Sequence, residues 1–322
     1  MKKVSIIGAG NVGASAAMKI ASMNIVDKVV LLDIKEGIPA GKAADINQCA
    51  SLLNFNTEVV GVSNDYSPTE NSDIIVITSG LPRKPGMTRE ELVGVNSKIL
   101  KEVVTKCHEY SSKAIYIIVS NPMDTMTYYA HKILKSLGRN DVDKTVFGMG
   151  GLLDSARFKY YIKEALNKTE YKDTNVSDIY AWVIGMHGDK TMIPLFNYAY
   201  INTYLYPHYI YDIFSPEDRD EIIEKTMKGG ATLTNLLGTS AWEAPAAAIA
   251  DTVKSIINNE NKLMPVSLYN ENDDVCIGTL VTVGNDGATL ACENEIFEEY
   301  EIKYKNSVEA VRKVNNELPN ID

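Results

Sequence analysis

A glycine-rich segment near the start of the chain has residue types that could bind a pyrophosphate. It follows the apolar run Val4–Ile7 and reads Gly8-Ala9-Gly10-Asn11-Val12-Gly13. In such a motif the first glycine permits a tight turn, the second lets the backbone approach the phosphates, and the third lets a helix pack closely on a strand. A helix that begins here also directs free N–H groups at the phosphates, which favours binding of an anion.

Asp33 makes the glycine motif more specific than it would be alone. This acid ends the second apolar run, 20 residues after Gly13, where its carboxylate can accept hydrogen bonds from an adenosine ribose. A carboxylate at this place would repel a 2′-phosphate, so we expect NAD rather than NADP as the cofactor. The alternative is a glycine turn that only packs, with Asp33 as an ordinary acid at the end of a strand.

A second group of residues could move a proton. His187 lies in the turn-like segment Gly185-Met186-His187-Gly188-Asp189, directly after the apolar run Ile179–Ile184, which we predict to be a strand. An imidazole titrates near neutrality and therefore suits a general base that takes a proton from a hydroxyl group. A lone histidine is more often structural than catalytic, and the spacing alone does not decide between the two roles.

Asp154 and Arg157 could place two opposite charges in the same site. They are three residues apart in a segment that we predict to be helical, and residues at this spacing share one face of a helix. An arginine that faces a site can bind a carboxylate through two parallel hydrogen bonds. The alternative is an exposed ion pair of little consequence.

Residues 80–89 form a basic loop punctuated by glycine and proline, between a predicted strand and a predicted helix. A mobile lid at this place would exclude water and bring cations onto an anionic substrate when it closes. A solvated basic loop is the alternative interpretation.

The elements that must position these residues alternate regularly through the first half of the chain. Helical patterns separate short apolar runs that we predict to be buried strands: Val4–Ile7, Val29–Leu32, Val59–Val62, Ile74–Thr78, Ala114–Ser120 and Thr145–Phe147. The clearest helical patterns are Val12–Ser22, Glu90–Glu109 and Thr125–Leu137. We therefore predict an α/β fold, with a doubly wound parallel Rossmann sheet in residues 1–149 and a mixed α+β substrate domain in residues 150–322.

Composition excludes several classes of protein. The chain has 322 residues, 45% of them apolar, and a formal net charge of −10, which disfavours nucleic-acid and membrane partners. The four cysteines show no metal-ligand spacing, so we expect reduced thiols and no bound metal. Neither a signal peptide nor a membrane-spanning run is apparent, and we expect a cytoplasmic protein.

Four segments, taken in order and with their spacing, resemble the L-lactate/L-malate dehydrogenase family. They are Leu81-Pro82-Arg83-Lys84-Pro85-Gly86-Met87-Thr88-Arg89, Val119-Ser120-Asn121-Pro122, Leu153-Asp154-Ser155-Ala156-Arg157-Phe158 and Gly185-Met186-His187-Gly188-Asp189. The resemblance extends from Val4 to an amphipathic helix around Glu295–Glu317. It implies hydride transfer between NAD and a small 2-hydroxy acid.

The resemblance also implies a role for each residue of the catalytic group. His187 would be the general acid–base, and Asp154 would fix the tautomer of its imidazole. Arg157 would bind the C1 carboxylate of the substrate, and Arg89 would polarise the reacting carbonyl. Arg83 holds the position that selects the substrate: an arginine pairs with the second carboxylate of malate or oxaloacetate, whereas lactate dehydrogenases carry a glutamine.

Other positions follow from the same resemblance. Asn121 would hydrogen-bond the substrate oxygen, and the Asn121–Pro122 bond is a candidate cis peptide. Cofactor contacts would come from Asn96, Val119, Ser120 and Asn121, in addition to Gly8, Ala9, Gly10, Asn11, Val12, Gly13 and Asp33. Ser240, in the segment 239–245, would face the substrate.

The segment 239–245 looks closer to the lactate-dehydrogenase-like malate dehydrogenases, which implies a homotetramer that serves the tricarboxylic acid cycle. Two departures from the family pattern are an extra residue between Asp189 and Pro194 and a short segment at Leu268–Cys276, which looks like a trimmed hairpin. The alternatives are an L-lactate dehydrogenase, an NADH sensor without activity, and an NAD-using glycosidase. Arg83 disfavours the first and the complete catalytic group the second, and the third would need metal ligands that the sequence does not offer.

Overall fold

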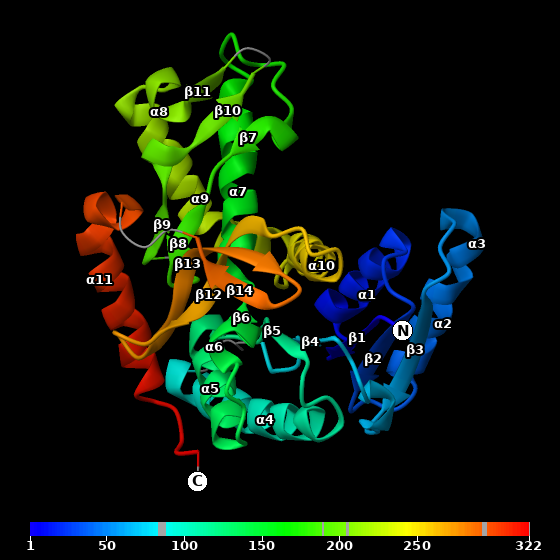
Figure 1. Ribbon diagram of the computed structural model, residues 1–322. Coiled ribbons are helices and arrows are strands. Elements are labelled where there is room, and N and C mark those ends of the chain that lie inside the picture. The colour runs from blue at the N-terminus through cyan, green and yellow to red at the C-terminus, as the bar shows by residue number, and fades with distance from the viewer. Residues whose placement is uncertain (83–87, 189, 204–205, 292–294, 322) are drawn as a thin grey trace.

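The computed structural model describes residues 1–82, 88–188, 190–203, 206–291 and 295–321. The side chains of Arg89 and of residues 295–297 are not described. Within the described residues the chain forms an 11-stranded sheet, a separate three-stranded sheet, and helices on both faces of the larger one (Figure 1).

Six parallel strands make up the first part of the large sheet. Their order is β3-β2-β1-β4-β5-β6, and they are β1 (Lys3–Ile7), β2 (Lys28–Asp33), β3 (Glu58–Ser63), β4 (Ile74–Ile77), β5 (Ile115–Ile118) and β6 (Val146–Gly148). All six predicted strands are therefore confirmed, with ends within two residues of the prediction. The order reverses between β1 and β4, which places the glycine turn after β1 at the switch point where doubly wound sheets bind ligands.

Helices bury both faces of this parallel sheet, which explains its runs of consecutive apolar residues. The connecting helices are α1 (Asn11–Met23), α2 (Ile38–Gln48), α3 (Ala50–Leu53), α4 (Arg89–Tyr110), α5 (Met123–Ser136) and α6 (Val142–Thr145). Alternate strand residues point to opposite faces: Val4, Ile6 and Val76 belong to one core, and Ile7, Ile75 and Ile77 to the other.

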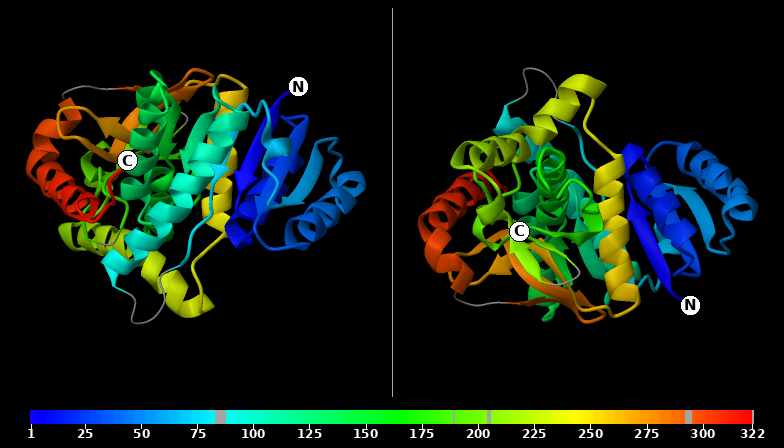
Figure 2. Two further views of the ribbon diagram at one scale, coloured as in Figure 1. Left: turned by 90° about the horizontal axis from the view of Figure 1, so that it is seen from below. Right: turned by 90° about the horizontal axis from the view of Figure 1, so that it is seen from above.

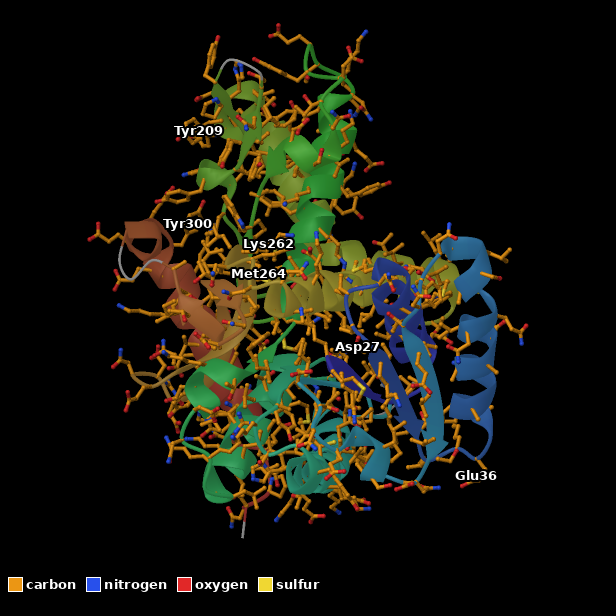
Figure 3. All side chains as sticks on the ribbon, turned by 45° about the vertical axis from the view of Figure 1, so that its right-hand side comes forward. Asp27, Glu36, Tyr209, Lys262, Met264 and Tyr300 are labelled. Atoms are coloured by element: carbon orange, nitrogen blue, oxygen red, sulfur yellow. The ribbon has the colours of Figure 1, made fainter. Side chains whose placement is uncertain are left out.

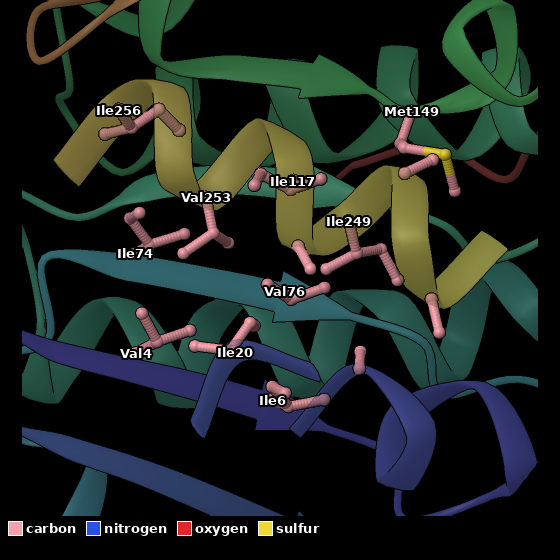
Figure 4. Close-up of a cluster of buried hydrophobic side chains, with 14 of the residues drawn as sticks. Val4, Ile6, Ile20, Ile74, Val76, Ile117, Met149, Ile249, Val253 and Ile256 are labelled. Carbon is pink, nitrogen blue, oxygen red and sulfur yellow. The ribbon is translucent and has the colours of Figure 1, made fainter. Parts of the chain in front are cut away.

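A helix from the second half of the chain completes the first of these cores. Helix α10 (Glu243–Ile257) lies along the parallel strands beside α1, and its Ile249 and Val253 pack with Val4, Val76 and Ile117 (Figures 2 and 4). The two halves of the chain therefore share one hydrophobic core.

The large sheet continues into the second half through antiparallel strands. β12 (Lys262–Asn270) pairs with β6 and with β13 (Val275–Gly284), which also pairs with β14 (Gly287–Leu290) and β8 (Val183–Gly185). β9 (Met192–Pro194) forms the edge beside β8. The short connection between β12 and β13 confirms the predicted hairpin around residues 268–276.

The run Ile179–Ile184 is not one strand, and that prediction was wrong. Ile179 and Tyr180 form β7, which pairs with β10 (Tyr200–Asn202) in the small sheet, whereas β8 starts at Val183 and belongs to the large sheet. The run is apolar throughout because it serves two sheets in succession. β11 (Pro207–Tyr209) completes the small sheet.

The remaining helices pack around the second half. They are α7 (Gly150–Leu166), α8 (Ile210–Ile213), α9 (Pro216–Leu237) and α11 (Glu295–Asn315), with 3₁₀ turns at Val176–Asp178 and Phe196–Tyr198. A further 3₁₀ turn, Ser67–Thr69, lies between β3 and β4. Helix α11 is the amphipathic helix predicted at the end of the chain. The lobe that carries Tyr209 projects away from the parallel strands β1, β2 and β3, near which Glu36 lies (Figure 3).

Candidate active site

The turn between β1 and α1 requires glycine at two positions and leaves open space at a third. Gly8 has φ +115°, and a Cβ there would lie 2.6 Å from Oγ1 of Thr78. A Cβ on Gly13 would lie 1.9 Å from the carbonyl oxygen of Gly8, so α1 could not pack on the turn. A Cβ on Gly10 would meet no atom within 4 Å, and the backbone there is open to a ligand.

Asp33 lies beside this turn, at the end of β2. Its Oδ2 accepts a hydrogen bond from the backbone N–H of Ala9 at 2.7 Å, and its Oδ1 accepts one from the N–H of Lys35 at 3.1 Å. The predicted ribose acceptor and the predicted phosphate turn are thus in direct contact.

Lys42 is a residue of the turn that the sequence analysis missed. From α2 its Nζ donates to the carbonyl oxygen of Ala9 at 2.7 Å, which places a positive charge next to the glycine turn. No signal in the sequence marks this lysine, because the contact exists only after α2 folds back over the ends of β1 and β2.

These groups fit a dinucleotide. Helix α1 starts at Asn11 with Gly10 as its N-cap, and no side chain caps its first N–H groups. An open second glycine, uncapped helix N–H groups, a nearby ammonium and a carboxylate at the end of β2 are what a pyrophosphate and an adjoining ribose need.

His187, Asp154 and Arg157 form a continuous ionic group. His187 follows β8, and its Nδ1 donates to Oδ2 of Asp154 at 2.7 Å. Arg157, on the same face of α7 as Asp154, donates from Nη1 to Oδ1 at 2.9 Å. Asp154 is only 1% exposed, so the alternative of a surface ion pair does not hold.

The electrostatics of this group favour a charged imidazole. Burial lowers the pKa of His187, but the charge of Asp154 and its hydrogen bond raise it, with a further contribution from Asp124. The neighbouring Arg157 lowers it. The net result is a pKa above the usual value of 6.5.

Arg157 has a donor that its bond to Asp154 does not use. Its Nε is buried and has no hydrogen-bond partner among the described residues. Gly229 and Gly230 of α9 lie beside its side chain, where a Cβ on Gly230 would come within 3.4 Å of both terminal nitrogens. The backbone of helix α9 therefore passes close to the guanidinium group.

Asp124 contacts His187, and Ser267 contacts Asp124; the sequence analysis missed both. Oδ2 of Asp124, in the first turn of α5, accepts the backbone N–H of His187 at 2.7 Å. The hydroxyl of Ser267, on β12, donates to Oδ1 at 2.6 Å. Burial raises the pKa of Asp124 to about 6, although both hydrogen bonds oppose this shift. The only feature of the sequence that could have pointed to Asp124 is its place three residues after Asn121.

Asn121 and Asn96 connect the loop after β4 with the segment after β5. The Asn121–Pro122 peptide is cis, as the sequence suggested, and the Asn121 side chain is exposed. Asn96, on α4, donates to the Asn121 carbonyl oxygen at 2.6 Å and accepts the Leu81 N–H at 2.8 Å. Ser120 donates to the Ser79 carbonyl oxygen, and Val119 is half-buried.

The remaining predicted site residues are only partly described by the structure. Arg83 and Asp189 fall outside the described residues, so the substrate-selecting position and the extra residue after Asp189 stay predictions. Arg89 is the first residue of α4, whose start is fixed by a capping box between Thr88 and Glu91. Ser240 is exposed in the connection between α9 and α10.

Comparison with family models identifies the chain. Residues 2–141 match the lactate/malate dehydrogenase NAD-binding domain, and residues 152–320 match the lactate/malate dehydrogenase α/β C-terminal domain. The chain belongs to the lactate/malate dehydrogenase family. The predicted family, the Rossmann fold and NAD as the cofactor are thereby confirmed.

Relatives of full length are named malate dehydrogenase. The proteins of Parabacteroides distasonis and Flavobacterium frigidimaris are 48% and 47% identical, over 100% and 99% of this chain and 99% of each relative. The structure of malate dehydrogenase from Salinibacter ruber superposes with a TM-score of 0.87 at 34% identity, covering 98% of this chain and 97% of that one.

Structures with ligands also superpose. A malate dehydrogenase from Plasmodium falciparum in complex with NADH gives a TM-score of 0.84 at 31% identity, covering 98% of both chains. A lactate dehydrogenase from Cryptosporidium parvum with lactic acid and NAD gives 0.84 at 28%, covering 99% of both. The overall fold is therefore common to enzymes of both names and does not select the substrate.

Two kinds of feature are absent from the described residues. None of the helices is both long and apolar enough to span a membrane. No group of three or more potential ligands could hold a metal ion in that part of the chain. Cys49, Cys107 and Cys276 are free thiols, and Cys292 lies outside the described residues.

Proposed function

We propose that this chain is an NAD-dependent L-malate dehydrogenase, which interconverts L-malate and oxaloacetate. The observation that carries the proposal is the buried His187–Asp154–Arg157 group, in a chain whose full-length relatives are named malate dehydrogenase. Arg83 supports malate over lactate, because a second carboxylate needs a cation that pyruvate and lactate do not.

Separate residues of the chain bind the cofactor, bind the substrate and transfer the proton. The turn Gly8–Gly13 and Asp33 hold the dinucleotide, and Arg157 binds the C1 carboxylate of the substrate. With Nδ1 donating to Asp154, Nε2 of neutral His187 is left to take the proton of the C2 hydroxyl. Bound NAD would supply the acceptor for the C2 hydrogen and its electron pair, so that the C2–O bond would become a carbonyl.

In the reverse direction the imidazolium of His187 returns the proton to the carbonyl oxygen. Arg89 polarises that carbonyl, Asn121 donates a hydrogen bond to it, and Arg83 pairs with the C4 carboxylate. Asn96, Val119 and Ser120 line the cofactor side, and Ser240 faces the substrate. These assignments rest on the family resemblance.

An assay of NADH oxidation with oxaloacetate and with pyruvate tests the proposal. We expect kcat/KM to be higher for oxaloacetate, and NADPH to be a poorer reductant than NADH. A preference for pyruvate would instead favour the second candidate, an L-lactate dehydrogenase.

We also propose that the enzyme is a homotetramer that acts in the cytoplasm and serves the tricarboxylic acid cycle. Resemblance of the segment 239–245 to the lactate-dehydrogenase-like branch supports the tetramer. Light scattering on the purified protein should give four times the mass of one chain, and a mass of twice the chain would contradict the tetramer.

A further inference from the structure

Two buried carboxylates hold His187 from opposite ends of the residue. Asp154 binds the imidazole through Nδ1, and Asp124 binds the backbone N–H at 2.7 Å. Both acids are 1% exposed, and they come from different helices, α7 and α5. The family roles described above account for Asp154 and leave Asp124 without one.

The hydrogen bonds of Asp124 serve the site and not its own helix. A carboxylate in the first turn of a helix usually stabilises that helix by facing its free N–H groups. The two partners of Asp124 lie elsewhere: the backbone of His187 after β8, and the hydroxyl of Ser267 on β12. Its side chain thus connects α5, β12 and the histidine turn.

A neutral side chain would make the same contacts at a lower cost. The oxygen of an asparagine can accept the N–H of His187, and its NH₂ group can donate to the Ser267 hydroxyl. Burying a carboxylate instead carries a large desolvation penalty unless a positive charge is close. The nearby positive charge is the imidazolium of His187, whose interaction with Asp124 favours the charged form of both groups.

The other titratable groups that face Asp124 do not supply this charge. Cys276 on β13 and Tyr304 on α11 lie within electrostatic range, and burial raises the pKa of both, that of Tyr304 to about 12. Both are neutral at the pH of an assay. Asp154 on α7 repels Asp124 and so raises its pKa. His187 is therefore the group whose charge Asp124 can favour.

We propose that Asp124 is a positioning residue for His187, with a carboxylate that anchors the histidine backbone and a negative charge that favours the imidazolium. Ser267 assists by donating to the same carboxylate. The proposal rests on the proposed function, because the proton held in this way is the one that reduction of the keto acid consumes. Asp124 itself touches neither substrate nor cofactor in this role.

The decisive experiment is an NMR titration of the His187 ring in the full-length protein without ligands. His187→Asn identifies the resonance among those of the four histidines. In Asp124→Asn the pKa of His187 should fall by roughly one unit, the lower end of what a nearby opposite charge produces. The fall of kcat/KM for keto-acid reduction at high pH should move to lower pH by the same amount.

Two further variants make the result specific. Ser267→Ala should also lower the pKa of His187, but by less. Loss of the Ser267 hydrogen bond raises the pKa of Asp124, so the carboxylate becomes charged only at a higher pH. Glu221→Gln removes one negative charge from the exposed face of α9, where Glu221 pairs with Lys225, and should leave the titration unchanged.

An unmoved His187 titration in folded Asp124→Asn would overturn the proposal, even if that variant were less stable to heat. If Asp124→Asn did not fold, the decision would pass to Ser267→Ala, and an unmoved titration there would overturn it equally. Because the titration needs no substrate, a wrong substrate assignment would appear only in the assay of oxaloacetate against pyruvate.

Discussion

Nδ1 of His187 and Oδ2 of Asp154 are 2.7 Å apart, although 33 residues separate them in the chain. The contact brings the end of β8 onto the first turns of α7, where Arg157 follows Asp154 after one helical turn. Because Nδ1 donates to a buried carboxylate, the imidazole has one orientation and one tautomer. Nε2 is then the nitrogen available to a substrate.

This relationship predicts opposite pH dependences for the two directions of the reaction. The pKa of His187 is raised: burial lowers it, but Asp154 and Asp124 outweigh that effect. Reduction of oxaloacetate needs the imidazolium, so its kcat/KM should be constant at low pH and fall as the pH passes the raised pKa. Oxidation of L-malate needs the neutral ring and should rise over the same range.

Initial rates in both directions between about pH 5 and 10 measure this prediction. His187→Asn should lose a factor of about 10²–10⁴ in either direction. His208→Asn is the matched control and should behave as the wild type. His208 lies beside Tyr171 in the lobe that carries Tyr209. If the rates of reduction and oxidation changed with pH in the same direction, His187 would be excluded as the group that exchanges the proton.

The local part of this site could be predicted from the sequence, and the long-range part could not. The glycine turn, Asp33 and the pair Asp154–Arg157 are set by spacing within one or two elements, and the parallel strands follow from buried apolar runs. Ser267 lies 143 residues after Asp124, and no periodicity relates them. Their contact depends on antiparallel β12 extending the parallel sheet at β6, which the alternation of elements does not imply.

A second prediction separates packing from binding in the glycine turn. Gly13→Ala would place a Cβ 1.9 Å from the Gly8 carbonyl oxygen, so this variant should lose thermal stability or fail to fold. Gly10→Ala places its Cβ in open space and should melt near the wild-type temperature, yet bind NADH more weakly because the methyl group occupies the approach to the turn.

Thermal melts and NADH fluorescence titrations of the two variants provide the comparison. Wild-type stability in Gly13→Ala would show that α1 can move away from the turn without cost. Wild-type affinity in Gly10→Ala would show that the pyrophosphate does not approach there.

A third prediction concerns the choice of cofactor. Asp33 bonds to the N–H of Ala9, which places its carboxylate beside the glycine turn. Asp33→Ser removes the charge that repels a 2′-phosphate, so NADH should bind more weakly and the preference for NADH over NADPH should decrease. Glu36→Gln removes a negative charge three residues further on, from an exposed side chain, and serves as the control.

The ratio of kcat/KM for NADH to that for NADPH is the quantity to measure. A ratio in Asp33→Ser equal to that of the wild type would remove Asp33 from the ribose site. A decrease of equal size in Glu36→Gln would mean that overall charge, and not a ribose contact, sets the preference.

The last prediction tests the substrate itself. Oxaloacetate carries one carboxylate more than pyruvate, and in a closed site this group must meet a cation. Arg157 bonds to Asp154 and, by the family resemblance, binds the C1 carboxylate that both keto acids share. By the family resemblance Arg89 polarises the carbonyl, which is also common to both. By the same resemblance Arg83 is the cation that pairs with the second carboxylate.

Arg83→Gln should therefore reverse or strongly reduce the preference for oxaloacetate. Loss of one partner from a buried, hydrogen-bonded charge pair costs about 2–5 kcal/mol. At about 1.4 kcal/mol per factor of ten, kcat/KM for oxaloacetate should fall by roughly 30-fold to several thousand-fold. Pyruvate should gain, because a neutral glutamine no longer faces its methyl group with an unpaired charge, although the gain should be smaller than the loss.

Measurements of kcat/KM for both keto acids in wild type and variant decide the matter, with Arg83→Lys as the matched control. Lysine keeps the charge without the planar fork, so it should retain part of the preference for oxaloacetate that glutamine loses. If the glutamine variant keeps the wild-type ratio, Arg83 does not read the second carboxylate. The specificity for malate must then come from other residues, because the overall fold is shared by enzymes that act on either substrate.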